Sequence, residues 1–174
     1  MSNPATEQAS PLLSIAPDAY HVGDRDNRPW GNYIVIDTGS YGNGEEYCKK
    51  MITINSLQIL SLQSHKQRRE TWTVKKGTLT VLRDGKILEL CAGESIDIPM
   101  GSIHCMANTG TEDCVVEEIQ EGFCREEDIH RYMDAYQRNT EMLAAPHAVE
   151  SFTAYREILI DINKARLERK HGAA

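Results

Sequence analysis

The chain has 174 residues, of which 40% are hydrophobic and 26% are charged, and its formal net charge is −7 at pH 7. These values are typical of a single soluble domain with a real core, and the acidic balance argues against a nucleic-acid-binding protein. No apolar run approaches the ~20 residues that cross a bilayer, and the N-terminus lacks the basic start of a secretory signal.

In chain order, residues 1–27 are predicted to form a loose N-terminal arm rich in Pro, Ser and Ala, with at most one short edge strand. Residues 28–138 follow a different pattern, because from Tyr33 onward short β-like runs alternate with turn signals. Asp84-Gly85 lies between two alternating runs and predicts a two-residue hairpin, since Gly accepts positive φ at little cost. The spacing favours an antiparallel sandwich or small barrel.

Residues 139–174 are predicted to be a C-terminal helical extension. Phe152, Tyr155, Leu159 and Ile162 recur at three- and four-residue steps, which is the pattern of an amphipathic helix. The mixed charges on its other face favour packing against its own barrel or a second subunit over a membrane surface. The preceding run EEDIHRYMDAYQR (126–138) is interpreted as a short helix or turn.

Two spaced polar motifs lie within the β-rich part. The first reads Gln63-x-His65-x4-Glu70-x6-Gly77, and the second, in GESIDIPMGSIHCMAN (93–108), reads G-x5-P-x-G-x2-H-x3-N with His104 as its histidine. Side chains at i and i+2 of a strand share a face, so Gln63 and His65 converge, and Glu70 can return from the next strand. These donors suit one divalent ion, with Zn as the first expectation and Fe, Mn, Co or Ni as alternatives.

The two motifs resemble the signatures of the cupin superfamily. That resemblance implies a mainly β fold, a double-stranded β-helix or jelly-roll barrel, with Gln63, His65, Glu70 and His104 holding a metal inside. Two positions depart from the general pattern, because Gln63 stands where most cupins have His and Leu57 where they have Gly. The alternative is structural: His65 pairs with Glu70 in a turn, and His104 is a hydrogen-bonded core histidine.

A narrower resemblance covers residues 28–138. This part of the chain resembles the type II mannose-6-phosphate isomerase family at five runs, which follow one another in the same order in that family. The runs are RPWGNYIVID, LSLQSHKQRRETW, IPMGSIH, EEIQEG and EEDIHRYMDAYQR. That family carries Gln at the position of Gln63, so Gln63 is an expected ligand there. The family's other positions are altered here at Lys66, Gln67, Thr71 and Gln137. No Gly-rich phosphate-cradling segment precedes the barrel, so nucleotidyl transfer is not expected.

The family resemblance implies interconversion of mannose 6-phosphate and fructose 6-phosphate through an enediolate. Candidate general bases are Lys50 and Glu118, and Arg68 would steady the enediolate or the phosphate. Arg131 and Arg138 are candidates for bidentate phosphate binding, with salt bridges to Glu126, Glu127, Asp128 or Asp134 as the alternative. Trp72 is interpreted as core packing.

Other functions remain open at this point. They are a different metal-dependent cupin enzyme, such as an iron oxygenase or a lyase acting on a small acid, a non-catalytic sugar-binding cupin, and a metal-free epimerase-like barrel. The expected partners are a small sugar phosphate and a second copy in a homodimer, with no nucleic acid and no membrane. Five cysteines without CxxC spacing predict free thiols and a cytoplasmic location.

Overall fold

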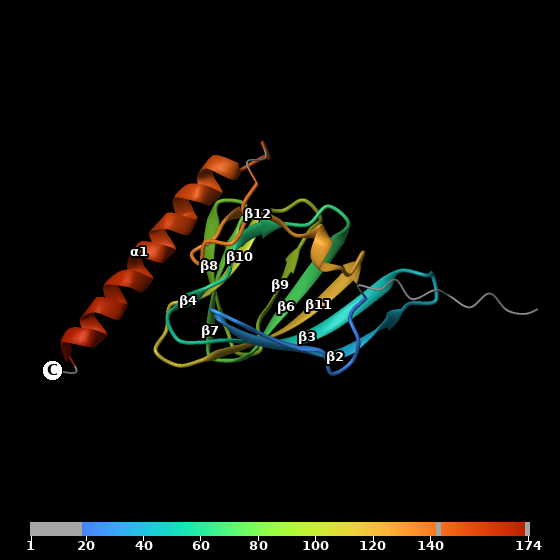
Figure 1. Ribbon diagram of the computed structural model, residues 1–174, viewed down its shortest axis with the longest axis horizontal. Helices are drawn as coiled ribbons and strands as arrows, with labels where there is room; N and C mark the ends of the chain where they lie inside the picture. The colour runs from blue at the N-terminus through green and yellow to red at the C-terminus, as the bar shows by residue number, and fades with distance from the viewer. Residues whose placement is uncertain (1–18, 142–143, 173–174) are drawn as a thin grey trace, which may run out of the picture.

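The computed structural model describes residues 19–141 and 144–172, so most of the predicted N-terminal arm lies outside the described residues. Figure 1 shows two β-sheets that face each other and one long helix, α1 (Ala148–Gly172), which lies against the outside of one of them. The predicted fold class, a cupin-like jelly-roll barrel with a C-terminal helix, is confirmed. Within the described residues, no helix is both long and apolar enough to cross a membrane.

Each sheet has six strands and is built from antiparallel pairs. The first sheet consists, in spatial order, of β1 (Arg25–Arg28), β2 (Gly31–Ser40), β3 (Glu46–Ile54), β11 (Cys114–Gly122), β6 (Arg68–Lys76) and β9 (Ser95–Ile98). The second consists of β12 (His130–Met133), β5 (Leu62–Ser64), β10 (His104–Asn108), β7 (Thr78–Arg83) and β8 (Lys86–Cys91), with β4 (Gln58–Ile59) paired to β10.

The barrel interior changes from polar to apolar along each central strand. On β6 the inward, buried positions are Arg68 and Glu70 and then Trp72 and Val74, because side chains alternate with a period of two. On the neighbouring β11 the register places Gln120 opposite Glu70. Glu118 is a further buried inward residue of β11, whereas the inward Cys114 and Val116 are apolar and join the main core cluster with Trp72 and Val74. One end of the barrel is therefore a hydrophobic core, and the other end holds buried ionisable groups.

The predicted hairpin turn at Asp84-Gly85 joins β7 to β8, and both residues have positive φ (49° and 80°). This is the backbone that a tight hairpin requires. Leu57 also has positive φ (57°), although its side chain is 4% exposed. General cupins have glycine there, and the backbone keeps the conformation that favours glycine while Leu57 adds buried apolar surface.

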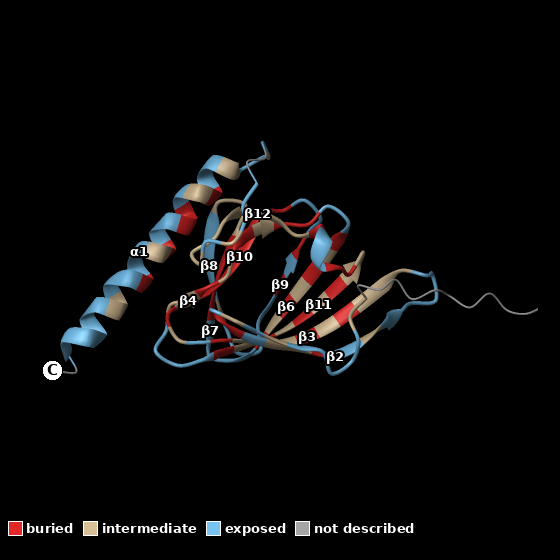
Figure 2. Cartoon of the chain, in the orientation of Figure 1, coloured by how far each residue is buried: buried red, intermediate tan, exposed pale blue. Residues whose placement is uncertain are grey.

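Helix α1 packs on its own barrel, as one of the two sequence-based alternatives predicted. Its buried residues are Ser151, Ala154, Tyr155, Ile158 and Ile162, and Figure 2 shows this buried stripe facing the barrel. The Tyr155 hydroxyl donates to the carbonyl of Leu60, which satisfies the polar end of a buried aromatic side chain.

The run at 126–138 differs from the short helix or turn expected for it. A 3₁₀ helix covers only Glu126–Asp128, and the chain then enters strand β12. Residues 130–133 form a strand because they pair with β5, so that β12 becomes the edge strand of the second sheet next to Gln63. Local propensity is a weak guide where tertiary hydrogen bonds are available.

Candidate metal centre

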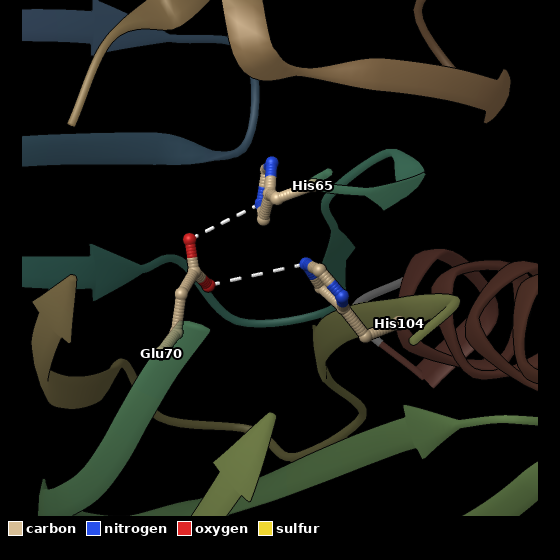
Figure 3. Close-up of side chains that lie close together, drawn as sticks. All are labelled: His65, Glu70 and His104. Atoms are coloured by element: carbon tan, nitrogen blue, oxygen red, sulfur yellow. Dashed lines mark ion pairs between the residues drawn. The ribbon is translucent and has the colours of Figure 1, made fainter. Parts of the chain in front are cut away.

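Three of the four predicted ligands meet at the polar end of the barrel. His65 follows β5, Glu70 lies on β6 and His104 begins β10, so the two sheets both contribute. Nε2 of His65 is 3.1 Å from Oε1 of Glu70, and Nε2 of His104 is 3.9 Å from Oε2 of the same carboxylate. Figure 3 shows both imidazoles pointing at this carboxylate. All three side chains are buried.

The loop that carries His65 is held by one buried carboxylate, Asp128. Its two oxygens accept hydrogen bonds from the backbone N–H groups of Lys66 and Gln67, each at 3.1 Å. Its backbone carbonyl lies 3.1 Å from Nδ1 of His65, so Nδ1 donates there and the ring is held with Nε2 facing Glu70, where a bound metal would take the place of the Nε2 proton. Asp128 therefore orients a candidate ligand from a distant segment.

The orientation of His104 has a similar origin. Its Nδ1 lies 2.9 Å from the carbonyl of Ser102, so Nδ1 donates and Nε2 faces the site as an acceptor. The hairpin residue Asp84 anchors this loop, because its carboxylate accepts from the Ser102 hydroxyl (2.7 Å) and from the backbone N–H of Ile103 (2.9 Å). The predicted hairpin residue Asp84 thus helps to fix the loop that positions the predicted ligand His104.

Glu70 is surrounded by donors. Nε of Arg68 and Nε1 of Trp72 each lie 3.0 Å from one of its oxygens, so Trp72 both packs in the core and holds this carboxylate. Burial opposes ionisation of Glu70, but the neighbouring His65 and Arg68 hold its pKa well below the usual value. The site therefore contains a charged carboxylate at neutral pH.

The chemistry of this group fits a divalent cation. The donor atoms of His65, Glu70 and His104 lie within 4.8 Å of one another, and two histidines with one carboxylate form a common Zn²⁺ ligand set. Nε2 of His104 is buried without a hydrogen-bond partner among the described residues. Burial, with the charge of His65 adding to it, lowers the pKa of His104 to about 4, so this nitrogen keeps its lone pair.

Two neighbouring side chains, Gln63 and Arg68, affect how a cation would bind to these three donors. Gln63 lies beside His65, with its amide nitrogen 3.5 Å from the His65 Nε2 and its amide oxygen accepting from Ser61. Rotation of the amide by 180° would turn its oxygen toward the site, because the Ser61 hydroxyl can also accept. Nη2 of Arg68 lies 3.2 Å from the same His65 nitrogen, so this guanidinium must move when a cation binds.

A cavity of about 70 Å³ opens beside these donors. Seven of the nine predicted site residues line it, namely Lys50, Gln63, Arg68, Glu70, Glu118, Arg131 and Arg138, whereas His65 and His104 lie behind Glu70 and outside the lining. The lining carries five Lys or Arg side chains and three Glu, an excess of positive charge within a chain of net charge −7. A local field of this kind favours an anionic ligand.

The two candidate bases lie on neighbouring strands and face each other in register, Lys50 on β3 and Glu118 on β11. Nζ of Lys50 sits 3.6 Å from the ring centre of Tyr20 and 4.8 Å from that of Tyr33. Glu118 accepts a 2.8 Å hydrogen bond from the Gln120 amide. Burial, reinforced by the Glu70 charge, raises the pKa of Glu118 to about 8.

The two predicted phosphate ligands differ in their present contacts. Arg138 forms a two-pronged ion pair with Asp134, at 2.6 and 3.2 Å, which is the salt-bridge alternative considered from the sequence. Arg131 lies within 4.0 Å of Glu126, and its Nε is buried without a partner in the part of the chain that the structure describes. Arg131 is therefore the more available of the two for a ligand.

Sequence reasoning missed several residues of the site. Arg28 and Glu126 also line the cavity, and Tyr20 and Tyr33 surround Lys50. Arg28 and Glu126 both lie in runs that carry the family resemblance, RPWGNYIVID and EEDIHRYMDAYQR, which was the available signal. Motif spacing did not show that these two runs meet.

Comparison with known proteins supports the family indicated by the motifs. The model of the family "Mannose-6-phosphate isomerase C-terminal" matches residues 17–134. Mannose-1-phosphate guanylyltransferase of Escherichia coli K12 is 40% identical over 112 residues, which are 64% of this chain and 22% of that protein. Alginate biosynthesis protein AlgA of Pseudomonas aeruginosa is 38% identical over 115 residues, 66% of this chain and 23% of that protein.

Among solved structures, an RmlC-like cupin from Shewanella frigidimarina has a TM-score of 0.51 at 16% identity and covers 63% of this chain and 96% of its own. That similarity supports the fold alone. This chain spans between a fifth and a quarter of the length of the two curated relatives above. Since the family model covers most of the barrel, the chain belongs to the mannose-6-phosphate isomerase C-terminal family of cupin domains.

Proposed function

We propose that this chain is a metal-dependent sugar-phosphate isomerase of the mannose 6-phosphate/fructose 6-phosphate type. The observation that carries the proposal is the position of three buried metal donors beside a cavity with an excess of positive charge. The donor group suits a divalent ion, Zn²⁺ first, and the charge suits a phosphorylated substrate. Membership of the family agrees with a sugar-phosphate ligand.

The reaction requires removal of a weakly acidic proton next to a carbonyl and its return to the adjacent carbon. A divalent ion at the donors would supply Lewis-acid polarisation of substrate oxygens. The proton is moved by Glu118 or Lys50, which face the cavity from adjacent strands. Arg68, buried and always cationic, places positive charge where the enediolate develops.

A coupled assay of mannose 6-phosphate conversion to fructose 6-phosphate tests this function, after chelation and with Zn, Mn, Co, Ni or Fe added back. If Glu118 moves the proton, Glu118→Gln should lower kcat by roughly 10²-fold or more. If Lys50 moves it, Lys50→Met should have this effect instead. Glu117→Gln and Lys49→Met are matched controls, because these neighbours are only half-buried and occupy the alternate positions of the same strands. A fully metallated protein with no turnover of any sugar phosphate would refute the proposal.

One observation favours a second candidate, a metal-dependent enzyme acting on a small acid. The cavity of about 70 Å³ holds only a few water molecules, so a hexose phosphate requires its mouth to widen. Oxygen consumption or decarboxylation with small carboxylic acids, in protein that turns over no sugar phosphate, would support this candidate.

The proposal includes a cytoplasmic location and a homodimer. All five cysteines are unpaired and four of them are buried, which supports a reducing compartment. Light scattering on the purified full chain measures the oligomeric state directly.

A further inference from the structure

We propose that the anion-binding end of the cavity is formed by Arg28 and Arg131, and that Glu126 acts as a built-in competitor that an incoming phosphate displaces. The inference rests on the proposed function for the identity of the substrate, a sugar phosphate. Neither Arg28 nor Glu126 was identified from the motifs, because they come from strand β1 and from the 3₁₀ helix before β12.

The geometry places one carboxylate oxygen between two guanidinium groups. Oε2 of Glu126 is 3.8 Å from Nη2 of Arg28 and 4.0 Å from Nη2 of Arg131. Both distances are too long for direct hydrogen bonds, so the carboxylate balances the charges without satisfying their donors. Nε of Arg131 is buried and has no partner in the described ranges 19–141 and 144–172. Glu126 therefore neutralises part of the charge of Arg28 and Arg131, but it leaves hydrogen-bond donors of these guanidinium groups available.

The position of this pair suits a substrate that also reaches the metal donors. Arg131 on β12 is the register partner of Gln63 on β5, one strand away in the same sheet. Neighbouring strands lie about 4.8 Å apart. Arg28 approaches from the opposite sheet, where it ends β1, and lines the same cavity. A molecule that touches the donors with one end therefore places its other end near the two arginines.

Charge repulsion among the cations supports an anionic occupant. Burial, then the charge of Arg138, and more weakly that of Arg28, lower the pKa of Arg131. Arg138 is already neutralised by Asp134, whereas Arg28 contacts Asp26 through a single nitrogen at 2.6 Å. A phosphate has more acceptor oxygens and more charge than one carboxylate, and arginine forks match its geometry.

Glu126 can leave this position at modest cost. Its side chain is 45% exposed, and its other oxygen accepts a hydrogen bond from the hydroxyl of Tyr20, which lines a neighbouring cavity together with Glu126. Desolvation opposes ionisation, but the Tyr20 hydrogen bond and the charge of Lys50 hold the pKa of Glu126 below its usual value. A charged Glu126 repels a phosphate at this place, so its removal should tighten anion binding.

Binding of inorganic phosphate to the full chain, followed by ³¹P NMR at low ionic strength before and after chelation of metals, tests the inference. Arg28→Met and Arg131→Met should each weaken phosphate binding about ten-fold or more, the effect of losing one charge-assisted contact. Glu126→Gln should tighten it by several-fold, on the order of one screened charge interaction. Arg25→Met and Glu127→Gln are matched controls, because both residues are exposed and absent from the cavity lining.

Arg28→Lys should lose only part of the affinity, since it keeps the charge and loses the fork, and thermal unfolding verifies that each variant is folded. Equal losses in Arg25→Met and Arg28→Met would overturn the inference, as would unchanged affinity in Arg28→Met or weaker binding in Glu126→Gln. Phosphate binding that disappears on chelation would place the anion on the metal and also overturn it. Arg28-dependent binding without any sugar-phosphate turnover would uphold this subsite while refuting the isomerase.

Discussion

Replacement of His104 by Leu should have opposite consequences with and without metal. In the metal-free protein, Nε2 of His104 is buried and has no hydrogen-bond partner among the described residues. A buried polar atom of this kind costs about 1–3 kcal/mol. Leucine removes that cost and keeps apolar contact with Trp72, whose ring lies edge-on to His104 with centres 5.4 Å apart.

The same replacement loses the hydrogen bond from Nδ1 to the carbonyl of Ser102, which contributes about 1 kcal/mol. The two effects nearly cancel, so the free energy of unfolding of His104→Leu should lie within about 2 kcal/mol of wild type in EDTA. With metal at 100 times its Kd, the wild type gains about 2.7 kcal/mol. That gain corresponds to roughly 5–10 °C in Tm for a chain of this size.

Calorimetric unfolding in EDTA and in Zn²⁺ gives both quantities from one protein preparation. His104→Leu should lose the metal-dependent increase in Tm. His130→Leu is the matched control, since His130 lies on β12, pairs with Glu141 and contributes nothing to the donor group, so it should keep the increase. An equal Zn²⁺ shift in His104→Leu and wild type would refute the metal assignment. A loss above about 3 kcal/mol in EDTA would show that His104 is a satisfied structural residue.

Three further predictions concern other parts of the chain. Asp128→Ala should weaken metal affinity about 10–100-fold in a competitive chelator titration, because it releases the loop that carries His65; unchanged affinity would contradict its orienting role. Gly31→Ala should destabilise the fold by more than about 2 kcal/mol in urea unfolding, since its Cβ would lie 2.0 Å from the carbonyl oxygen of Thr53 and its φ is +147°. A thiol reagent such as Ellman's reagent should modify one cysteine in the native protein and five after denaturation, because only Cys91 is exposed; loss of the native signal in Cys91→Ser checks the assignment.

Local patterns in the sequence predicted much of the barrel and the core of the site. The period of two along a strand brings Glu70 and Trp72 to the same inner face, and the Asp84-Gly85 pair carries the positive φ values that its hairpin needs. The resemblance of the two spaced motifs to cupin signatures identified His65 and His104, which the structure brings together. These predictions succeeded because each depends on residues within one strand, one turn or one known pair of motifs.

Tertiary structure decided what depends on contacts between distant segments. Asp128 orients His65 across the end of the barrel, and Arg28 and Glu126 meet in the cavity from β1 and the 3₁₀ helix. Strand pairing also converted residues 130–133 from an expected helix or turn into an edge strand. The physical reason is the same in each case: residue spacing determines which side chains share a face, whereas the order of strands in the closed sheets determines which faces meet.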